Sequence, residues 1–307
     1  MNPHSIFAAI FNDTPTDVVL GGIERMSASH NNEIDSKPRS GEDSPRQQSI
    51  KRQLPGVTFS TIQLDKALLN IGQSGAAIGS LATGMDFYLQ KHLEHGTRDT
   101  GSNHTKYSMT RGLIYPVQIT ASGAEPAEMD VVALASYDGA NEPMIETVGQ
   151  ALPSGVVDNE QFVLGSVTLE SLALTSMQSM EISIGLVPIP RFEGGDIWPT
   201  FIGYETTEPT IIFRGLDPAW LGSGVIPRKG KIITHGNTAI YLKKRDLANP
   251  GTFVADGTAE HIKITIAGLA TIESAFDGSG SAAAETVLAV RGKGPGPLVI
   301  TRASAIT

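Results

Sequence analysis

Two segments of the sequence carry residue types that metal binding or catalysis would use. His92, His95 and His104 include two imidazoles three residues apart, which could share one face of a helix or a turn. The residues between them are typical of an exposed loop, and no carboxylate completes a known zinc motif, so we expect a solvated histidine loop. Gly72-Gln-Ser-Gly-Ala76 approaches the G-x-S-x-G nucleophile motif, but Ala76 stands where the second glycine belongs.

Two glycine-rich segments could hold an ion, and both lack a required feature. Asp277-Gly-Ser-Gly-Ser281 has no carboxylate at alternate positions, as a calcium loop needs. Gly292-Lys-Gly-Pro-Gly-Pro297 connects two strand-like runs, whereas a phosphate-binding loop opens a helix. The chain has no cysteine, which excludes a thiol nucleophile and a thiolate-ligated metal. We therefore expect no enzyme activity, no catalytic residue, no metal site and no cofactor.

The composition narrows the classes of partner. The 307 residues carry 23 basic and 32 acidic side chains, and this acidic balance argues against a protein that binds nucleic acid through its phosphates. No apolar run approaches the roughly 18 residues of a spanning helix, and no basic segment precedes the short apolar run near the N-terminus. We expect a protein made in a cytoplasm without a membrane partner. Charged residues form only 18% of the chain, which leaves surface for contacts between subunits.

Most of the chain predicts β-strands. Apolar residues alternate with polar ones along Met180–Leu186 and Ile262–Ile266, which is the pattern of a half-buried strand. Helices are expected only at 67–72 and 217–221, besides one near the N-terminus. The predicted fold is mainly β, an antiparallel sandwich or barrel. Further strands are expected at 57–64, 114–120, 129–135, 162–169, 197–204, 210–214, 238–243, 270–275 and 286–291.

The first 55 residues differ from the rest, and we expect them to form an N-terminal arm that is polar and flexible unless docked. Residues 26–54 contain too few large apolar side chains to offset their ordering entropy, which predicts disorder in isolation. Ahead of them, Ile6, Phe7, Ile10 and Phe11 have the spacing of one side of a short helix. That helix could fold back on its own domain or contact a neighbouring subunit. The long polar tether favours the inter-subunit contact.

A weak internal repeat suggests two related β-modules. The residues from Gly112 to Pro126 match those from Gly195 to Pro209 with six identities at one constant offset. Coincidence between two strands that begin with an aromatic residue and proline is the alternative. If the repeat is real, the modules meet near Leu152–Asn159. The predicted organisation is an arm at 1–55, a first module at 56–158 and a second module at 159–307.

Four segments in the second half form a recognisable pattern: Gly165-Ser-Val-Thr-Leu-Glu-Ser-Leu172, Ser176-Met-Gln-Ser-Met-Glu-Ile-Ser-Ile-Gly185, Glu193-Gly-Gly-Asp-Ile-Trp-Pro-Thr200 and Glu208-Pro-Thr-Ile-Ile-Phe213. In this pattern the chain resembles the tail tube proteins of long-tailed bacteriophages. The resemblance covers about 162–306, and 57–150 more loosely, while the polar N-terminal extension departs from the shortest members. It implies a β-sandwich whose inner strands join across subunits into a continuous barrel.

This resemblance implies a virion protein of the phage tail, assembled in the host cytoplasm. Copies of the chain would form stacked rings around a lumen through which viral DNA passes without specific binding, and other tail proteins would be further partners. Hexameric rings are expected, with trimeric rings of duplicated modules as the alternative. Residues 1–55 hold seven acidic and six basic side chains, so nearly all of the net charge of −9 lies in the β-rich remainder. An acidic lumen would repel phosphates.

Two other functions remain open from the sequence. One is a different phage structural β-protein, such as a distal tail, head-tail connector or capsid-decorating protein. It would form a single ring, cap or spike. The other is a β-jelly-roll carbohydrate-binding module or hydrolase, which needs an aromatic-lined cleft. Only 6% of the residues are aromatic and two are tryptophan, so such a cleft is hard to build.

Overall fold

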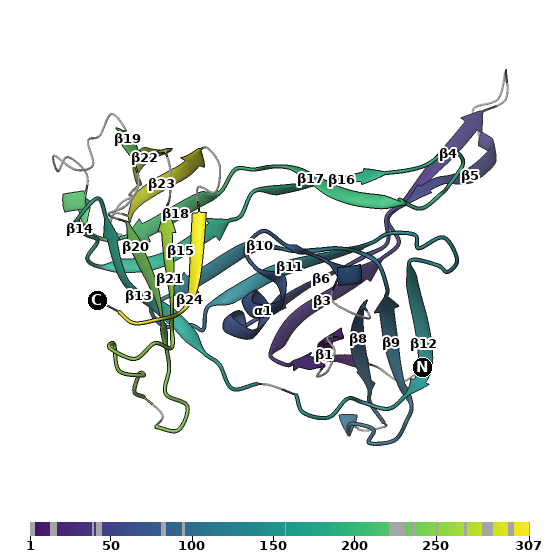
Figure 1. Cartoon of the computed structure of the whole chain (residues 1–307), viewed down its shortest axis with the longest axis horizontal. Coiled ribbons are helices and arrows are strands. Elements are labelled where there is room, and N and C mark those ends of the chain that lie inside the picture. The colour runs from purple at the N-terminus through teal and green to yellow at the C-terminus, as the bar shows by residue number, and fades with distance from the viewer. Residues whose placement is uncertain are drawn as a thin grey trace.

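The structure is mainly β, with antiparallel sheets throughout, as the sequence predicts (Figure 1). The computed structural model describes residues 4–306, apart from 13–16, 39, 41–44, 81–83, 94–95, 157, 221–230, 235–237, 250, 267–268, 278–284 and 294–297.

One sheet of ten strands contains strands from both halves of the chain. Its order is β19-β22-β23-β18-β15-β10-β11-β6-β3, and β7 pairs with β10. Its strands are β3 (Ile23–Ser29), β6 (Gly56–Thr61), β7 (Ala76–Ala77), β10 (Gly112–Ser122), β11 (Glu128–Ala135), β15 (Met177–Ser183), β18 (Thr210–Gly215), β19 (Lys231–Thr234), β22 (Leu269–Asp277) and β23 (Glu285–Lys293).

Two sheets of five strands pack against the two halves of this long sheet. Their orders are β12-β9-β8-β1-β2 and β14-β13-β20-β21-β24. The first contains β1 (His4–Asn12), β2 (Val18–Leu20), β8 (Gly84–Lys91), β9 (His104–Met109) and β12 (Met144–Gln150). The second contains β13 (Phe162–Leu169), β14 (Leu172–Ala173), β20 (Ala239–Lys244), β21 (His261–Ile266) and β24 (Leu298–Ser304).

Two long hairpins and a few short helical elements complete the described fold. The first hairpin joins β4 (Asn32–Pro38) to β5 (Pro45–Gln53), and the second joins β16 (Leu186–Arg191) to β17 (Phe201–Thr207). The helical elements are the α-helix α1 (Leu64–Ile71) and the 3-10 turns η1 (Ile78–Ser80) and η3 (Pro218–Trp220).

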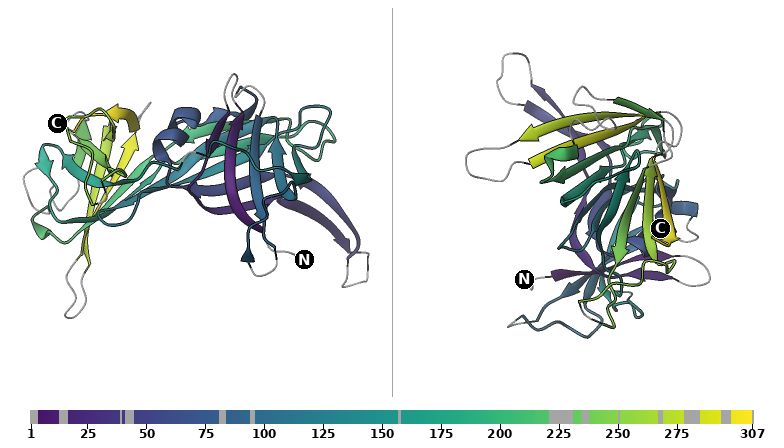
Figure 2. Two further views of the ribbon diagram at one scale, coloured as in Figure 1. Left: turned by 90° about the horizontal axis from the view of Figure 1, so that it is seen from below. Right: turned by 90° about the vertical axis from the view of Figure 1, so that its left-hand side faces the viewer.

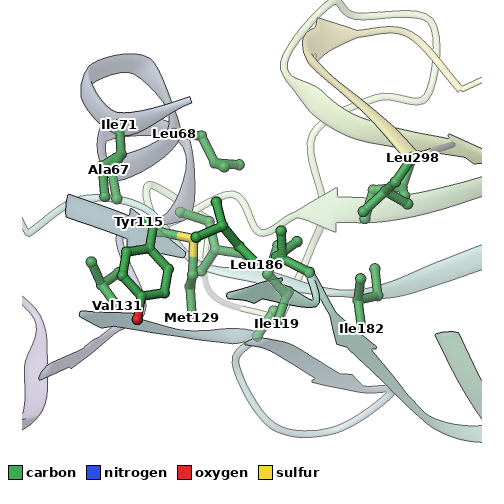
Figure 3. Packing of buried hydrophobic residues seen from close by; sticks show 14 of the residues in the cluster. Ala67, Leu68, Ile71, Tyr115, Ile119, Met129, Val131, Ile182, Leu186 and Leu298 are labelled. Atoms are coloured by element: carbon green, nitrogen blue, oxygen red, sulfur yellow. The ribbon is translucent and has the colours of Figure 1, made fainter. Parts of the chain in front are cut away.

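One hydrophobic core lies between the long sheet and the two smaller sheets. In the first half, Phe59 of β6 meets Phe87 of β8 with ring centroids 5.6 Å apart. The main cluster of buried apolar side chains continues through Ile119 and Ile182 into the second half without a break. Figure 3 shows this continuity, with side chains of α1, β10, β15 and β24 around one space. The two halves therefore fold around a shared core.

The second half of the chain repeats the strand topology of the first. The order β12-β9-β8-β1-β2 corresponds to β24-β21-β20-β13-β14, and β7-β10-β11-β6-β3 corresponds to β19-β22-β23-β18-β15. Each β-strand in the first half thus has a counterpart twelve strands later. We call residues 4–150 the first module and residues 162–306 the second module. Figure 1 shows them side by side.

The repeat has a definite residue register. Ile23 pairs with Thr61, and Met177 pairs with Gly215, each just before a β-bulge in the same strand pair, which sets an offset of 154 residues. The hairpins at 32–53 and 186–207 keep this offset. Met26, Pro55 and Phe59 have identical counterparts in Met180, Pro209 and Phe213.

Backbone conformations and buried histidines repeat as well. Asn31 and its counterpart Gly185 both adopt the left-handed conformation, with φ of 45° and 67°. His104 begins β9 and His261 begins β21, and both are fully buried. Each accepts, at Nδ1, the backbone N–H of the lysine that ends the neighbouring strand, at 3.1 Å in both modules. The two modules therefore share local structure as well as strand order.

The internal repeat predicted from the sequence has the wrong register. Gly112 begins β10, whereas Gly195 lies in the turn between β16 and β17. The counterpart of β10 is β22, because each pairs with the strand that follows it and with a short earlier strand. The six matches used in the prediction connect elements with different places in the fold.

The helix predicted near the N-terminus is wrong. Residues 6–11 lie in β1, which pairs with β8 and β2 of the same chain. Ala9 and Phe11 face the main core, while Ala8 and Ile10 pack with Val19 on the other face. A strand buried on both faces reads as a continuous apolar run without alternation, and this one also has a helix-like spacing.

The N-terminal arm at 1–55 also needs correction. Its described strands β1, β2 and β3 are part of the sheets of the first module, and residues 32–53 form the β4–β5 hairpin. In this single chain, Ile10 and Phe11 are buried against strands of the same chain. The inter-subunit contact of Ile6, Phe7, Ile10 and Phe11 stays a prediction. Hydrogen bonds between the main chains of β4 and β5 order residues 32–53, although their side chains are mostly polar.

Candidate assembly surface

The residues that suggested catalysis or metal binding do not converge on one site. Ser74 lies in the turn from α1 to β7, and a nucleophile elbow needs the opposite order, strand then helix. His104 is fully buried, so its assignment to a solvated loop is wrong, and His95 lies outside the described residues. Within the described ranges, no three His, Asp or Glu side chains gather where they could hold a metal ion.

The two glycine-rich candidates fall largely outside the described residues, which exclude 278–284 and 294–297. Gly292 lies in β23, where its backbone N–H donates to Pro209 O at 2.8 Å. Ala135 makes the same bond to Pro55 O in the first module. Among the described helices, none has the length and apolarity of a membrane span.

The most informative surface is the junction where β10 of the first module pairs with β15 of the second. Gln118 lies opposite Ser183, Ile119 opposite Ile182 and Thr120 opposite Glu181. Ile119 and Ile182 are both fully buried, so the sheet and the core cross the junction together. This edge pairing joins two modules of one topology into a continuous sheet.

A second set of contacts ties α1 to β24. Arg302 donates to both carboxylate oxygens of Asp65, with Nε–Oδ1 at 2.6 Å and Nη2–Oδ2 at 2.8 Å. Gln73 bonds the main chain of β24 twice, donating to Leu298 O at 2.8 Å and accepting from Ile300 N at 2.5 Å. Bidentate charged bonds and main-chain bonds fix orientation, so the second module is held at a set angle to the first.

A buried acid lies where the linker between the modules meets α1. Glu160 is 5% exposed, and its Oε2 accepts the backbone N–H of Lys66 at 3.3 Å. Burial, followed by the negative charge of Asp65, raises the pKa of Glu160. The fully buried Gln63 also donates to Asp158 Oδ1 and to Glu160 O, at 3.1 Å each. The linker is thus fastened to the first module by polar bonds.

The β16–β17 hairpin leaves the second module and lies along the first. Figures 1 and 2 show it reaching the base of the β4–β5 hairpin. There, Gln53 N donates to Ile197 O and Trp198 Nε1 donates to Gln53 Oε1, both at 2.7 Å. The Trp198 ring lies 5.4 Å from that of Tyr137, whose N–H donates to Pro199 O at 2.7 Å. These bonds anchor the tip of the hairpin.

The β4–β5 hairpin has the same length and extends away from the second module (Figure 1). Ile34 and Ile50 face each other across its strands and are 59% and 45% exposed. Lys51 Nζ lies 2.7 Å from Glu33 Oε1 beside them. This hairpin therefore presents an apolar pair to solvent, whereas the tip of its counterpart is anchored on a module.

Near each end of the long sheet, one strand edge corresponds to an edge that is paired at the β10–β15 junction. The outer edge of β3, the counterpart of β15, pairs with no strand among the described residues. In β22, the counterpart of β10, β19 covers 269–272 and leaves the outer edge of 273–277 likewise without a described partner. Residues 26–29 of β3 contain no charge or proline, the usual protection of an exposed edge.

The outer face of the long sheet is polar along the strands from β3 to β18. One row of opposed residues crosses seven strands, and Arg25 forms ion pairs in it with Glu128 at 3.0 Å and Asp130 at 3.4 Å. Among the residues of this face whose side chains the structure describes, which exclude those of β22 and the ends of β23, three arginines and three acids alternate with buried residues. The row is Arg25, Ser60, Asp130, Gln118, Ser183, Thr210 and Arg291, and the charged residues are Arg25, Arg214, Arg291, Glu128, Asp130 and Glu181.

Comparisons of the sequence supply no relative that would assign a function. Neither a protein-family model nor a curated protein matches it. The edges of β3 and β22 and the β4–β5 hairpin were not among the residues that sequence reasoning selected. The matches of Met26, Pro55 and Phe59 at the 154-residue offset are the signal that could have located them.

Proposed function

We propose that this chain is a structural subunit that assembles with copies of itself into closed rings, which stack into the tail tube of a long-tailed bacteriophage. The observation that carries the proposal is the internal junction between modules of one topology, together with the corresponding edges of β3 and β22 at the two ends. A head-to-tail contact of this kind closes into a ring when its rotation closes.

The duplication changes the expected number of chains in a ring. The resemblance to tail tube proteins implies six-fold rings, and two modules in each chain supply six positions from three chains. We therefore favour the trimer of duplicated modules over the hexamer. The long sheet, joined from chain to chain, would line the lumen.

The outer face of that sheet has features that suit the passage of DNA. On this face Arg25 is paired to Glu128 and Asp130, and Gln118 and Ser183 lie opposite each other at the junction of the modules. A face without a surplus of positive charge gains little from counterion release, so it would not hold DNA. This supports a lumen through which DNA passes without specific binding.

Measuring the mass of the purified chain and imaging it by negative-stain electron microscopy tests the proposal. We expect rings of three 32.4-kDa chains, about 97 kDa, that stack into tubes as protein concentration rises. Rings or caps that never stack would favour another virion component. A monomer at every salt and protein concentration would contradict ring assembly altogether.

A further inference from the structure

We infer that copies of this chain join by the same contact that joins the two modules within it. In this contact, β3 of one copy pairs with residues 273–277 of β22 in the next, and the β4–β5 hairpin lies across the second module of that next copy. The inference rests on the proposed function and specifies the interface that ring assembly would use.

The first step is the correspondence of the edges. Within the chain, β15 pairs with the later part of β10, while β7 covers the earlier part. In the second module, β19 pairs with the earlier part of β22. Residues 273–277 of β22 therefore correspond to the part of β10 that pairs with β15. The strand that corresponds to β15 is β3, at the far end of the sheet. One copy thus carries both halves of the contact.

The second step is the register. Ile119 lies opposite Met129, and Phe276 lies opposite Thr286, at corresponding positions of β10 and β22. Ile119 pairs across the junction with Ile182, whose counterpart at the 154-residue offset is Ala28. Phe276 of one copy should therefore lie opposite Ala28 of the next. The same register places Ala275 opposite Ser29 and Asp277 opposite Ser27.

The third step is the hairpin. Because β16 follows β15, the β16–β17 hairpin leans over the module to which β15 is paired, and its tip bonds to Gln53. The β4–β5 hairpin follows β3 and extends beyond the first module in the corresponding direction (Figure 1). Pairing of β3 with a second copy would bring that copy's second module under the hairpin. Ile34 and Ile50, now exposed, would lie near it.

Cysteine cross-linking tests the edge contact, because the natural chain contains no cysteine. Opposed residues in antiparallel strands have Cα atoms about 4.5–5.5 Å apart, within the range of a disulfide, whereas residues displaced by two lie about 7–8 Å apart. The test variant is Ser29→Cys with Ala275→Cys. The control with displaced register is Ser27→Cys with Ala275→Cys. Gln118→Cys with Ser183→Cys, the corresponding pair inside one chain, controls for the chemistry.

Mild oxidation followed by denaturing gels without reductant should give a ladder of linked chains for Ser29→Cys with Ala275→Cys. The displaced pair should give at least tenfold less. The internal pair should close within the monomer. If rings form and the internal pair closes but Ser29→Cys with Ala275→Cys does not link, the interface is overturned and ring assembly stands. Stronger linking of the displaced pair overturns the register. Absence of any oligomer overturns both proposals.

A second variant tests the hairpin apart from the edge. Ile34→Asp with Ile50→Asp places charges on an already exposed pair, so the single chain should keep its melting temperature. We expect at least tenfold less ring at equal concentration, measured by analytical ultracentrifugation. Leu93→Asp is the matched control, since Leu93 is 42% exposed in a turn outside the two hairpins. Unchanged assembly of the Ile34→Asp, Ile50→Asp variant would overturn the hairpin part of the contact.

Discussion

Single residues decide how firmly the two modules are joined. Asp65 and Arg302 form a bidentate pair between α1 and β24, and Glu160 is buried beside the same helix. The negative charge of Asp65 acts in opposite ways on these two neighbours, since it attracts Arg302 and raises the pKa of Glu160. Ionisation of Glu160 therefore lowers the stability of the folded chain.

Replacing Glu160 with glutamine should stabilise the chain above the raised pKa. The folded chain binds the Glu160 proton more tightly than the unfolded chain, in which the pKa has its usual value of 4.5. The fold therefore loses stability as pH rises from 4.5 through the raised pKa. Glu160→Gln should raise the melting temperature by a few degrees at pH 8 and change it little at pH 4.5.

The exposed Glu142→Gln is the control for this measurement, because it removes the same charge without burial. Its melting temperature should follow that of the natural chain at both pH values. Equal melting temperatures of Glu160→Gln and the natural chain at pH 8 would contradict the stated cost of burying the carboxylate.

At the scale of elements, two hairpins of equal length have different surroundings. The β16–β17 hairpin is anchored at its tip by Trp198 and Pro199, whereas β4–β5 exposes Ile34 and Ile50. Neither hairpin contributes to the main sheet, so each depends on what its tip contacts. An isolated two-stranded hairpin is marginal in water.

Trp198→Ala should release the tip of the β16–β17 hairpin while the modules stay folded. The change removes one hydrogen bond to Gln53 and the ring contact with Tyr137, which together stabilise docking by about 1–3 kcal/mol. Limited proteolysis followed by mass spectrometry should reveal faster cleavage within 192–200. Phe201→Ala, on the same hairpin but 55% exposed, should be cut at the natural rate. Equal protection of both variants would contradict docking through Trp198.

At the scale of the molecule, the modules share one sheet and one core. Ile119 and Ile182 bury the junction between them, and no solvent-exposed boundary separates the described parts of the main cluster. Two domains joined by a flexible linker would unfold independently. A duplicated chain built around a continuous core should behave as one unit.

We therefore predict a single cooperative unfolding transition for the monomeric chain. Calorimetry at low protein concentration should give a calorimetric enthalpy equal to the van't Hoff enthalpy, as for a two-state unit. The comparison variant is Ile182→Asp, which places a charge in the buried junction. Its unfolding transition should split or broaden, because the two modules no longer share an intact core. Two transitions in the natural chain, with enthalpies divided between the modules, would contradict the shared core.

Local patterning in the sequence was enough to predict most strands of the long sheet. Met180, Ile182 and Ile184 alternate with polar residues because one face of β15 meets the core and the other does not. The same logic failed for β1, whose Ala8 to Phe11 are buried on both faces. It also failed for residues 32–53, where polar side chains hide a hairpin that main-chain bonds hold together.

By itself, then, the sequence determined an antiparallel β fold without cysteine, because these properties follow from periodicity, turns and composition. Only the tertiary structure decided which strands pair, and with it the true register of the duplication. Pairing partners such as Gln118 and Ser183 are far apart in the chain, so no local pattern specifies them. The proposed assembly surface consists of the strand edges of β3 and β22, which are unpaired only in the context of the folded sheet, as far as the structure describes it.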